Sequence, residues 1–253
     1  MTDREAADKR LFDKIAESYV RKDLTTYCRI CRKLRLYKTL KNIPKPITIL
    51  LEVGCGAGFS ADYLRGQYHR FIGLDHSENL IAYAQKYNSS DNTVFICGNI
   101  KDFVNYQKFQ VILMIGVLHH IPDVQDVLMN LKSYLEPDGL IVVNEPQKGN
   151  PLIVFMRKIR KKIDKKYSVD QVEFSEVELR RIFIECGYKT KTFPQGILST
   201  PLAETRILPN FIGIPLALLF RAVDPILERL ISLSVLRKLA WNVVVEARID
   251  VGN

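Results

Sequence analysis

Three closely spaced glycines have the residue type and spacing to hold a ligand against bare backbone. Residues 49–59 read ILLEVGCGAGF, in which an apolar run leads into Gly54, Gly56 and Gly58. Glycine has no Cβ, so such a turn can adopt positive φ, and a ligand can lie against its amides at the start of the next helix. Glu52 adds a carboxylate beside the turn. This pattern predicts a buried strand that ends in a ligand-binding turn.

A second carboxylate follows the next apolar run. Asp75 comes directly after residues 70–74 and lies 21 residues beyond Gly54, close to the interval of about 20 residues at which a carboxylate meets a ribose diol in nucleotide-binding folds. The dinucleotide fingerprint G-x-G-x-x-G would need a glycine at position 59, where this chain has Phe59. We therefore predict a nucleoside-bearing ligand other than a nicotinamide dinucleotide.

Two adjacent histidines are the candidate proton acceptors. His119 and His120 follow the apolar run at 109–115, and imidazole has the right pKa to remove a proton near neutrality. The alternative is that one ring is buried and holds the loop. We rank His119 slightly above His120 as the catalytic base.

The elements that must position these residues alternate between strand and helix. Helices are predicted over 3–41 (two helices), 57–67, 77–87, 124–135, 175–186, 215–223 and 225–240, with Asp224 as the N-cap of the last and a turn at 137–139. Strands are predicted over 47–53, 70–74, 93–97, 109–115, 140–143, 188–193 and 241–248. This alternation indicates a parallel sheet, in which ligands bind at the carboxyl ends of the strands.

The length of 253 residues favours one domain with insertions. We divide it into an N-terminal helical cap (1–46), a ligand-binding core (47–146), a basic insertion (147–174), an apolar helical insertion (196–240) and a last strand (241–248). Both insertions leave from the carboxyl edge of the sheet, so we expect them to cover the site.

The composition indicates which partners and which cellular location suit the protein. The net charge of +9 favours an anionic partner without choosing among phospholipid, nucleic acid and acidic substrate. Five scattered cysteines indicate reduced thiols, and the charged N-terminus lacks the apolar segment of a secretory signal. We expect a cytoplasmic location.

The ordered set of motifs resembles the class I S-adenosylmethionine-dependent methyltransferases, in the small-molecule branch (methyltransferase type 11) related to quinone biosynthesis. The motifs are FDKIAESY at 12–19, LEVGCGAG at 51–58, GLD at 73–75, GNI at 98–100, VLHHIPD at 117–123 and LEPDGLIVVNEP at 135–146. The resemblance covers residues 8–145 well and 175–193 moderately. It implies an α/β, Rossmann-like seven-stranded sheet with an antiparallel last strand, with N-terminal helices and helical insertions over the site.

The resemblance also implies which residues bind the cofactor, S-adenosyl-L-methionine. These are Tyr19, Glu52, Gly54, Cys55, Gly56, Gly58, Asp75, His76, Asn99, Ile100 and Gly116. Glu52, Gly54 and Gly56 would surround its methionine part, and Asp75 would bond the ribose hydroxyls. Tyr19 would close over the amino acid end, although it fits equally well as a core aromatic.

The base of the cofactor would lie between His76 and Ile100. Asn99 stands where the family commonly has Asp to accept from the adenine amine. An amide oxygen can accept the same bond without the charge.

The loop after the fourth strand separates this chain from two related groups. Some quinone O-methyltransferases bind a metal there through two Glu and a His, whereas this chain has Gly116, His119 and His120. Because hard cations prefer oxygen ligands, we predict no metal. Enzymes that methylate the amino groups of nucleic acid bases carry Asn/Asp-Pro-Pro-aromatic where this chain has GVLH, so that activity is disfavoured.

The sequences of the two insertions indicate the kind of methyl acceptor. Residues 211–220 read FIGIPLALLF, which is shorter than the roughly 20 residues of a membrane span, so we expect no span. The apolar face at 225–240 fits packing onto the domain, a cover over the acceptor, a homodimer interface or a bilayer contact. Together with the basic run at 157–166 it favours peripheral contact with the inner face of a membrane and an apolar or lipid-linked acceptor.

The leading interpretation is methyl transfer to oxygen, or less favourably to carbon or nitrogen, of a small apolar acceptor. One alternative is a tRNA-modifying methyltransferase, which the positive charge supports but the scarcity of aromatics among the basic clusters does not. The other is a noncatalytic scaffold that keeps the fold. Its expected signs, a degraded glycine turn or a lost ribose carboxylate, are missing, since Gly54 and Asp75 are present.

Overall fold

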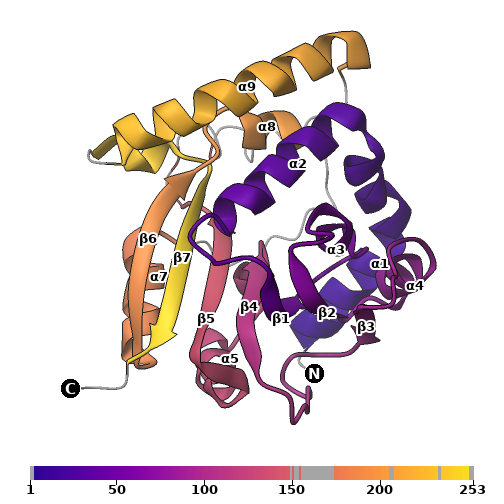
Figure 1. Ribbon diagram of the computed structural model, residues 1–253, viewed down its shortest axis with the longest axis vertical. Coiled ribbons are helices and arrows are strands. Elements are labelled where there is room, and N and C mark those ends of the chain that lie inside the picture. The colour runs from indigo at the N-terminus through magenta and orange to yellow at the C-terminus, as the bar shows by residue number, and fades with distance from the viewer. Residues whose placement is uncertain are drawn as a thin grey trace.

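A computed structural model describes residues 3–148, 150, 154, 174–204, 208–232 and 235–250. Seven strands form one sheet in the order β3-β2-β1-β4-β5-β7-β6 (Figure 1). The strands are β1 (Ile47–Val53), β2 (Tyr68–Asp75), β3 (Thr93–Cys97), β4 (Phe109–Ile115), β5 (Leu135–Pro146), β6 (Tyr188–Gln195) and β7 (Asn242–Ile249). The predicted fold class is confirmed.

The sheet topology places the site. The first five strands are parallel to one another, while β7 is antiparallel to both β5 and β6. The chain leaves β1 toward β2 and β3, then returns to β4 on the other side of β1. The order of the strands therefore reverses between β1 and β4, and ligands bind at such a reversal, outside the carboxyl ends of the strands.

Helices cover both faces of the sheet. One face carries α2 (Thr26–Thr39), α3 (Phe59–Tyr63) and α4 (Glu78–Tyr87), and the other carries α5 (Val124–Leu131) and α7 (Glu176–Glu185). Strand residues alternate between the two cores; in β4, Val111 and Leu113 pack with the first group while Ile112 and Met114 pack with the second. Burial on both faces explains the unbroken apolar runs of the central strands.

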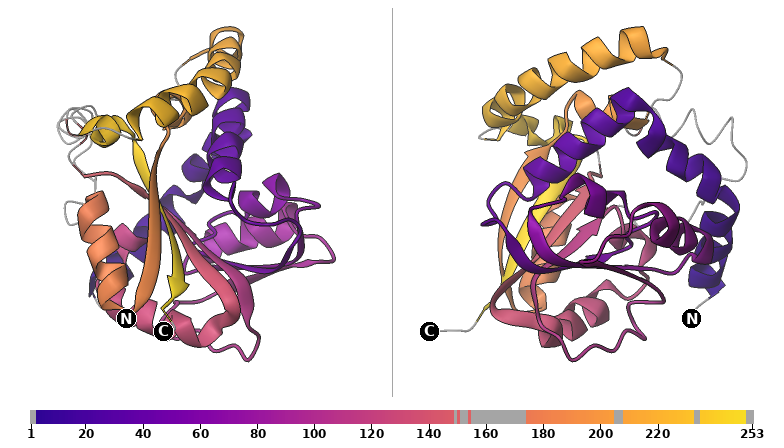
Figure 2. Two further views of the ribbon diagram at one scale, coloured as in Figure 1. Left: turned by 60° about the vertical axis from the view of Figure 1, so that its left-hand side comes forward. Right: turned by 45° about the vertical axis from the view of Figure 1, so that its right-hand side comes forward.

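The first helix, α1 (Asp3–Leu24), lies at the edge of this layered body, beside α4 (Figure 2). Its Ala16 and Val20 pack against Ala57 of the glycine turn and Leu80 of α4. Three of the five residues that it buries are acidic, namely Glu5, Asp8 and Asp23. The helix is thus attached through both apolar and polar contacts.

The C-terminal insertion differs from the prediction of two helices. The structure has α8 (Ser199–Glu204), one continuous helix α9 (Asn210–Ile231) and a 3-10 turn (Val235–Leu239). Asp224 is not the N-cap of a separate helix. It is fully buried within α9, and its carboxylate accepts hydrogen bonds from the Leu198 and Ser199 N–H groups at 2.9 Å each, at the start of α8.

The length of α9 also overturns the argument against a membrane span. Within the described residues, α9 is the helix that is long and apolar enough to cross a bilayer, by length and composition. In the structure it lies along α2, at the top of Figure 1, where Gly213 allows a close approach to the ring of Tyr27. An added Cβ at Gly213 would lie 2.4 Å from that ring.

Three smaller boundaries were also predicted wrongly. Helix α3 begins two residues later than predicted because Gly58, its N-cap, has a φ of +75°, and it ends at Tyr63. The helix expected at 124–135 ends as α-helix at Leu131 and continues as a 3-10 turn (Lys132–Tyr134). The turn expected at 137–139 is a register shift inside β5. The basic run at 157–166 lies outside the described residues.

Candidate active site

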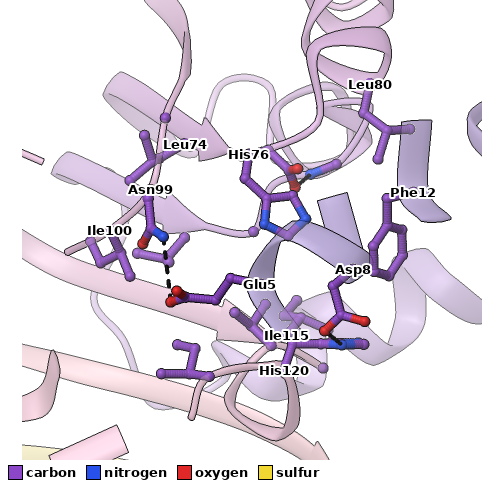
Figure 3. Close-up of a pocket in the computed structure, with 18 of the residues that line it drawn as sticks. Glu5, Asp8, Phe12, Leu74, His76, Leu80, Asn99, Ile100, Ile115 and His120 are labelled. Carbon is purple, nitrogen blue, oxygen red and sulfur yellow. Dashed lines mark hydrogen bonds and ion pairs between the residues drawn. The ribbon is translucent and has the colours of Figure 1, made fainter. Parts of the chain in front are cut away.

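Two adjoining cavities open at the carboxyl ends of the strands. The main cavity, about 830 Å³ including its opening to solvent, is lined by the glycine turn, the ends of β2 and β4 and the loop after β3, and is covered by α1 through Glu5, Asp8 and Phe12 (Figure 3). The side cavity, about 500 Å³, lies between the glycine turn and α2. Tyr19 and Gly54 line both. The apolar insertion lines neither cavity within the described residues, so the cover that it was expected to provide comes from α1.

The glycine turn is shaped by positive φ angles. Gly54 and Gly56 have φ values of +70° and +54° and face the main cavity. A Cβ on Gly54 would lie 2.4 Å from Val117, and one on Gly56 would lie 3.4 Å from the ring of Tyr19. Side chains are therefore excluded where the turn meets the cavity.

Asp75 is held in place by backbone donors at the edge of the main cavity. Its carboxylate accepts from the Gly56 N–H at 2.8 Å and the Ser77 N–H at 2.9 Å. Burial raises the pKa of Asp75, and these two hydrogen bonds oppose that rise. Each carboxylate oxygen keeps a second lone pair that can accept from a ligand hydroxyl.

The residues predicted to bind the base all line the same cavity as Asp75. His76, Asn99 and Ile100 line the main cavity beside Leu74 (Figure 3). The amide of Asn99 accepts the backbone N–H of Lys101 at 3.0 Å through Oδ1. Its Nδ2 faces Glu5 of α1, 3.5 Å from Oε1.

Glu52 faces the side cavity, not the main one. Its Oε1 accepts from the Ser60 hydroxyl at 2.8 Å, while its Oε2 is buried without a partner in the described part of the chain. Burial raises the pKa of Glu52 to about 8. An unpartnered buried carboxylate oxygen calls for a donor from a ligand or water.

The same cavity is lined by two arginines of α2. Arg32 donates to Asp23 at 2.7 Å and approaches Glu204 at 3.8 Å. The guanidinium of Arg35 has neither a hydrogen-bond nor an ionic partner among the described residues. The side cavity therefore presents a guanidinium and a carboxyl oxygen that both lack partners among the described residues.

The two histidines have different surroundings. His119 Nδ1 lies 2.7 Å from Glu145 Oε2, and the other oxygen of Glu145 accepts the Val117 and Leu118 N–H groups at 2.7 Å each. His120 lines the main cavity, with Nδ1 3.2 Å from Asp8 Oδ2.

The protonation state of His120 suits a base. Burial lowers its pKa, against the opposing effect of Asp8. A carboxylate beside Nδ1 favours the tautomer with the proton on that atom, which leaves Nε2 as the acceptor. Nε2 has no hydrogen-bond partner within the described ranges.

Most of the residues predicted from sequence meet around the two cavities. The side cavity is lined by Glu52 and Cys55. The main cavity is lined by Tyr19, Gly54, Gly56, Asp75, His76, Asn99, Ile100, Gly116 and His120. Gly58 and His119 line neither. Gly58 instead packs under Phe95, whose ring would lie 2.6 Å from an added Cβ.

Sequence reasoning missed Glu5, Asp8 and Arg35. A signal was present for the two acids, since they continue the helical spacing of Phe12 and Tyr19 toward the N-terminus of α1. From sequence, only Tyr19 of that face was assigned to the site. The described residues contain no group of three or more His, Cys, Asp or Glu side chains arranged to hold a metal ion.

Comparison with known proteins agrees with this geometry. Residues 51–143 match the family model of the methyltransferase domain. The ubiquinone biosynthesis O-methyltransferase of Rickettsia conorii is 26% identical over 134 residues, which cover 51% of this chain and 45% of that protein. Its counterpart in Coxiella burnetii is 31% identical over 107 residues, 40% of this chain and 46% of that protein. The chain thus spans under half the length of the curated relatives that it matches.

Solved structures match over nearly the whole chain. A S-adenosylmethionine-dependent methyltransferase from Thermotoga maritima, described as a possible histamine N-methyltransferase, superposes with a TM-score of 0.64 at 17% identity, covering 94% of this chain and 97% of that one. The complex of DhpI with SAH (S-adenosylhomocysteine) gives 0.62 at 15% identity, covering 98% of each chain. At these identities the likeness concerns the fold.

The fold, the site and the match of residues 51–143 to the methyltransferase domain all support a class I S-adenosylmethionine-dependent methyltransferase. S-adenosylmethionine is the cofactor of that class.

Proposed function

We propose that this protein transfers the methyl group of S-adenosylmethionine to an oxygen of a small, apolar or lipid-like acceptor. The observation that carries the proposal is the Asp8–His120 pair, which lines the same cavity as the glycine turn and Asp75. An acceptor hydroxyl must lose a proton when it is methylated, and a neutral imidazole beside a carboxylate can take it.

In the proposed transfer, the bond that forms is matched by one that breaks. A C–O bond forms as the C–S bond of the sulfonium breaks, so S-adenosylhomocysteine leaves as a neutral thioether, and the hydroxyl proton passes to His120 Nε2 and then to water. We assign the base to His120 in preference to His119, because His120 lines the cavity and its Nε2 is available. His119 is assigned a positioning role through Glu145, which also binds the loop backbone.

The two cavities fit the parts of the cofactor. Asp75 would bond the ribose hydroxyls, and the glycine turn would lie against the chain that leads to the sulfonium. The amino acid end would enter the side cavity, where its carboxylate meets Arg35, its ammonium meets Glu52, and Tyr19 covers both. The Arg35 guanidinium and Glu52 Oε2 have no partners in the described structure, which supports this placement.

An apolar acceptor is supported by the rest of the main cavity. Its walls include Phe12, Leu80, Val117 and Ile121, which suit an aromatic or aliphatic body better than a charged one. The curated relatives are named ubiquinone biosynthesis O-methyltransferases, and we extend oxygen as the target atom from them to this chain.

A panel of acceptors with labelled S-adenosylmethionine tests the proposal. We expect transfer to apolar phenols and catechols, including lipid-linked ones, and none to histamine-like amines or to tRNA. Transfer of the label to tRNA, with no transfer to phenols, would instead support the RNA-modifying alternative. Cofactor binding without turnover of any acceptor would support a noncatalytic scaffold.

The outer face of α9 supports peripheral contact with an anionic bilayer, which we place at the inner face of a membrane in the cytoplasm. Its exposed large side chains are apolar, with Phe211 79%, Leu218 51% and Leu230 68% exposed. The exposed charged residues of α9 are Arg221 and Arg229, while its acidic residues, Asp224 and Glu228, are buried.

Apolar side chains flanked only by cations match the interface of an anionic bilayer. A second copy of the chain is the competing occupant of this face, because an apolar helix can also form a homodimer interface. The arginines favour the bilayer, since two copies would bring like charges together.

A further inference from the structure

The orientation of the Asn99 amide determines which group it offers to a bound base. Its Oδ1 accepts the Lys101 N–H at 3.0 Å, and this bond fixes the oxygen toward the backbone of its own loop. Its Nδ2 is consequently the atom that faces across the cavity, toward Glu5 Oε1 at 3.5 Å (Figure 3). Asn99 therefore presents a donor, whereas an amine needs an acceptor.

The acceptor nearest to that donor comes from α1. Glu5 is 7% exposed, lines the main cavity and forms an ion pair with Lys101 Nζ at 3.0 Å. Carboxylates are seldom buried to this extent without a partner that repays their lost hydration. Glu5 thus contributes a fixed negative group next to the residues that surround the predicted base site.

We propose that Glu5, and not Asn99, accepts the hydrogen bond of the adenine amine, while the Asn99 amide donates to the base. This inference rests on S-adenosylmethionine being the cofactor and goes beyond it by naming the specificity-determining residue for adenine. Adenine carries an exocyclic amine beside a ring nitrogen that accepts, and the pair of Glu5 and Asn99 offers the complementary acceptor and donor.

The placement of the carboxylate has a structural consequence. Asn99 belongs to the loop after β3, which is part of the core, whereas Glu5 belongs to the helix that covers the cavity. Adenine would therefore be bound fully only when α1 lies in its present position. Binding of the cofactor and docking of the N-terminal turn of α1 would be one event.

Exchange of the two side-chain types tests the proposal. Binding of S-adenosylhomocysteine is measured by isothermal titration for wild type, Glu5→Gln, Asn99→Asp and the double variant, with thermal unfolding as a check on folding. Loss of one charge-assisted hydrogen bond should weaken binding about tenfold in Glu5→Gln. Asn99→Asp should also weaken it, because a second carboxylate would face Glu5. The double variant, which moves the charge from helix to loop, should return to within about threefold of wild type.

A second ligand makes the test specific for the amine. Wild type should bind S-adenosylhomocysteine more tightly than its inosine counterpart, in which an oxygen replaces the amine, and Glu5→Gln should lose that preference. The matched control is Glu17→Gln, which removes an exposed carboxylate of the same helix that pairs with Arg21.

Three results would overturn the proposal: unchanged affinity and preference in Glu5→Gln, tighter binding in Asn99→Asp alone, or no recovery in the double variant. No binding of S-adenosylhomocysteine by wild type would instead contradict the cofactor assignment itself.

Discussion

At the scale of single residues, the proposed methyl transfer depends on the imidazole of His120. Burial places the pKa of His120 below its ordinary value of 6.5. A base with a lowered pKa stays neutral to lower pH, so we predict that kcat is constant above pH 6.5 and falls only in more acidic solution. The pH profile of kcat with a phenolic acceptor checks this.

His120→Gln should lower kcat by about 10²-fold or more and remove the acid limb of the profile. Its affinity for S-adenosylhomocysteine should change little, because the role is in proton transfer. His69→Gln, which alters an exposed histidine of β2, is the matched control. Unchanged turnover in His120→Gln would show that the proton leaves by another route.

Arg35 gives a second prediction at this scale. Its guanidinium lacks a partner in the described structure and lines the side cavity, so Arg35→Met should weaken S-adenosylmethionine binding about tenfold through the lost charge-assisted bond to the ligand carboxylate. Lys33→Met, an exposed cation of the same helix, should have no effect. Equal affinities for the two variants would place the amino acid end elsewhere.

These residues also show what sequence could and could not predict. Gly54 and Asp75 could be placed beside the cavity from sequence, because a bare turn after the first strand and a carboxylate after the second have fixed places in a wound sheet. Glu5, Asp8 and Arg35 were missed because their roles depend on how α1 and α2 lie over the site. Helical spacing places such residues on a face and leaves open what that face contacts.

At the scale of elements, the two prolines inside α9, Pro215 and Pro225, were misleading. Pro225 suggested that a new helix begins there with Asp224 as its N-cap, yet α9 runs through it. The Asp224 carboxylate instead binds the amides at the start of α8, and Glu228, one turn later, accepts the Gly196 N–H at 2.7 Å. A residue typical of a helix start can therefore serve the start of another helix.

Asp224→Asn tests this contact. An amide cannot accept from every donor that the carboxylate satisfies, so we predict a loss of about 1–3 kcal/mol in the free energy of unfolding. Denaturant titration measures it, with Arg221→Gln on the exposed side of α9 as a control that should stay within about 0.5 kcal/mol of wild type. Equal stability of the two variants would show that Asp224 does not join α8 to α9.

At the scale of the whole molecule, the fold was the most predictable level. Apolar runs at regular intervals specify strands buried on both faces, and right-handed connections leave few ways to order them. What the pattern left open was the outermost layer, because an apolar helix fits a core, a partner or a bilayer equally well. The exposed apolar side chains of α9, together with the burial of its two acidic residues, favour the bilayer.

A vesicle assay tests whether the outer face of α9 contacts a bilayer. We predict that the protein sediments with phosphatidylglycerol vesicles and that the triple variant of Phe211, Leu218 and Leu230 to Ser does not, because it removes the apolar contact area. Val104→Ser, at a loop residue that is 76% exposed, is the control. Equal sedimentation of the triple variant would contradict bilayer contact, and a wild-type dimer that the triple variant dissociates would assign the face to a second copy.

The central claim is that the glycine turn and Asp75 bind an S-adenosyl ligand, and titration calorimetry tests it most directly. Wild-type protein and Asp75→Ala would each be titrated with S-adenosylmethionine and with S-adenosylhomocysteine. We predict micromolar binding by wild type and its collapse in the variant, which loses both the ribose acceptor and the hydrogen bond that Asp75 accepts from the Gly56 N–H of the glycine turn. No heat and no thermal stabilisation with wild type, or full affinity in Asp75→Ala, would contradict it.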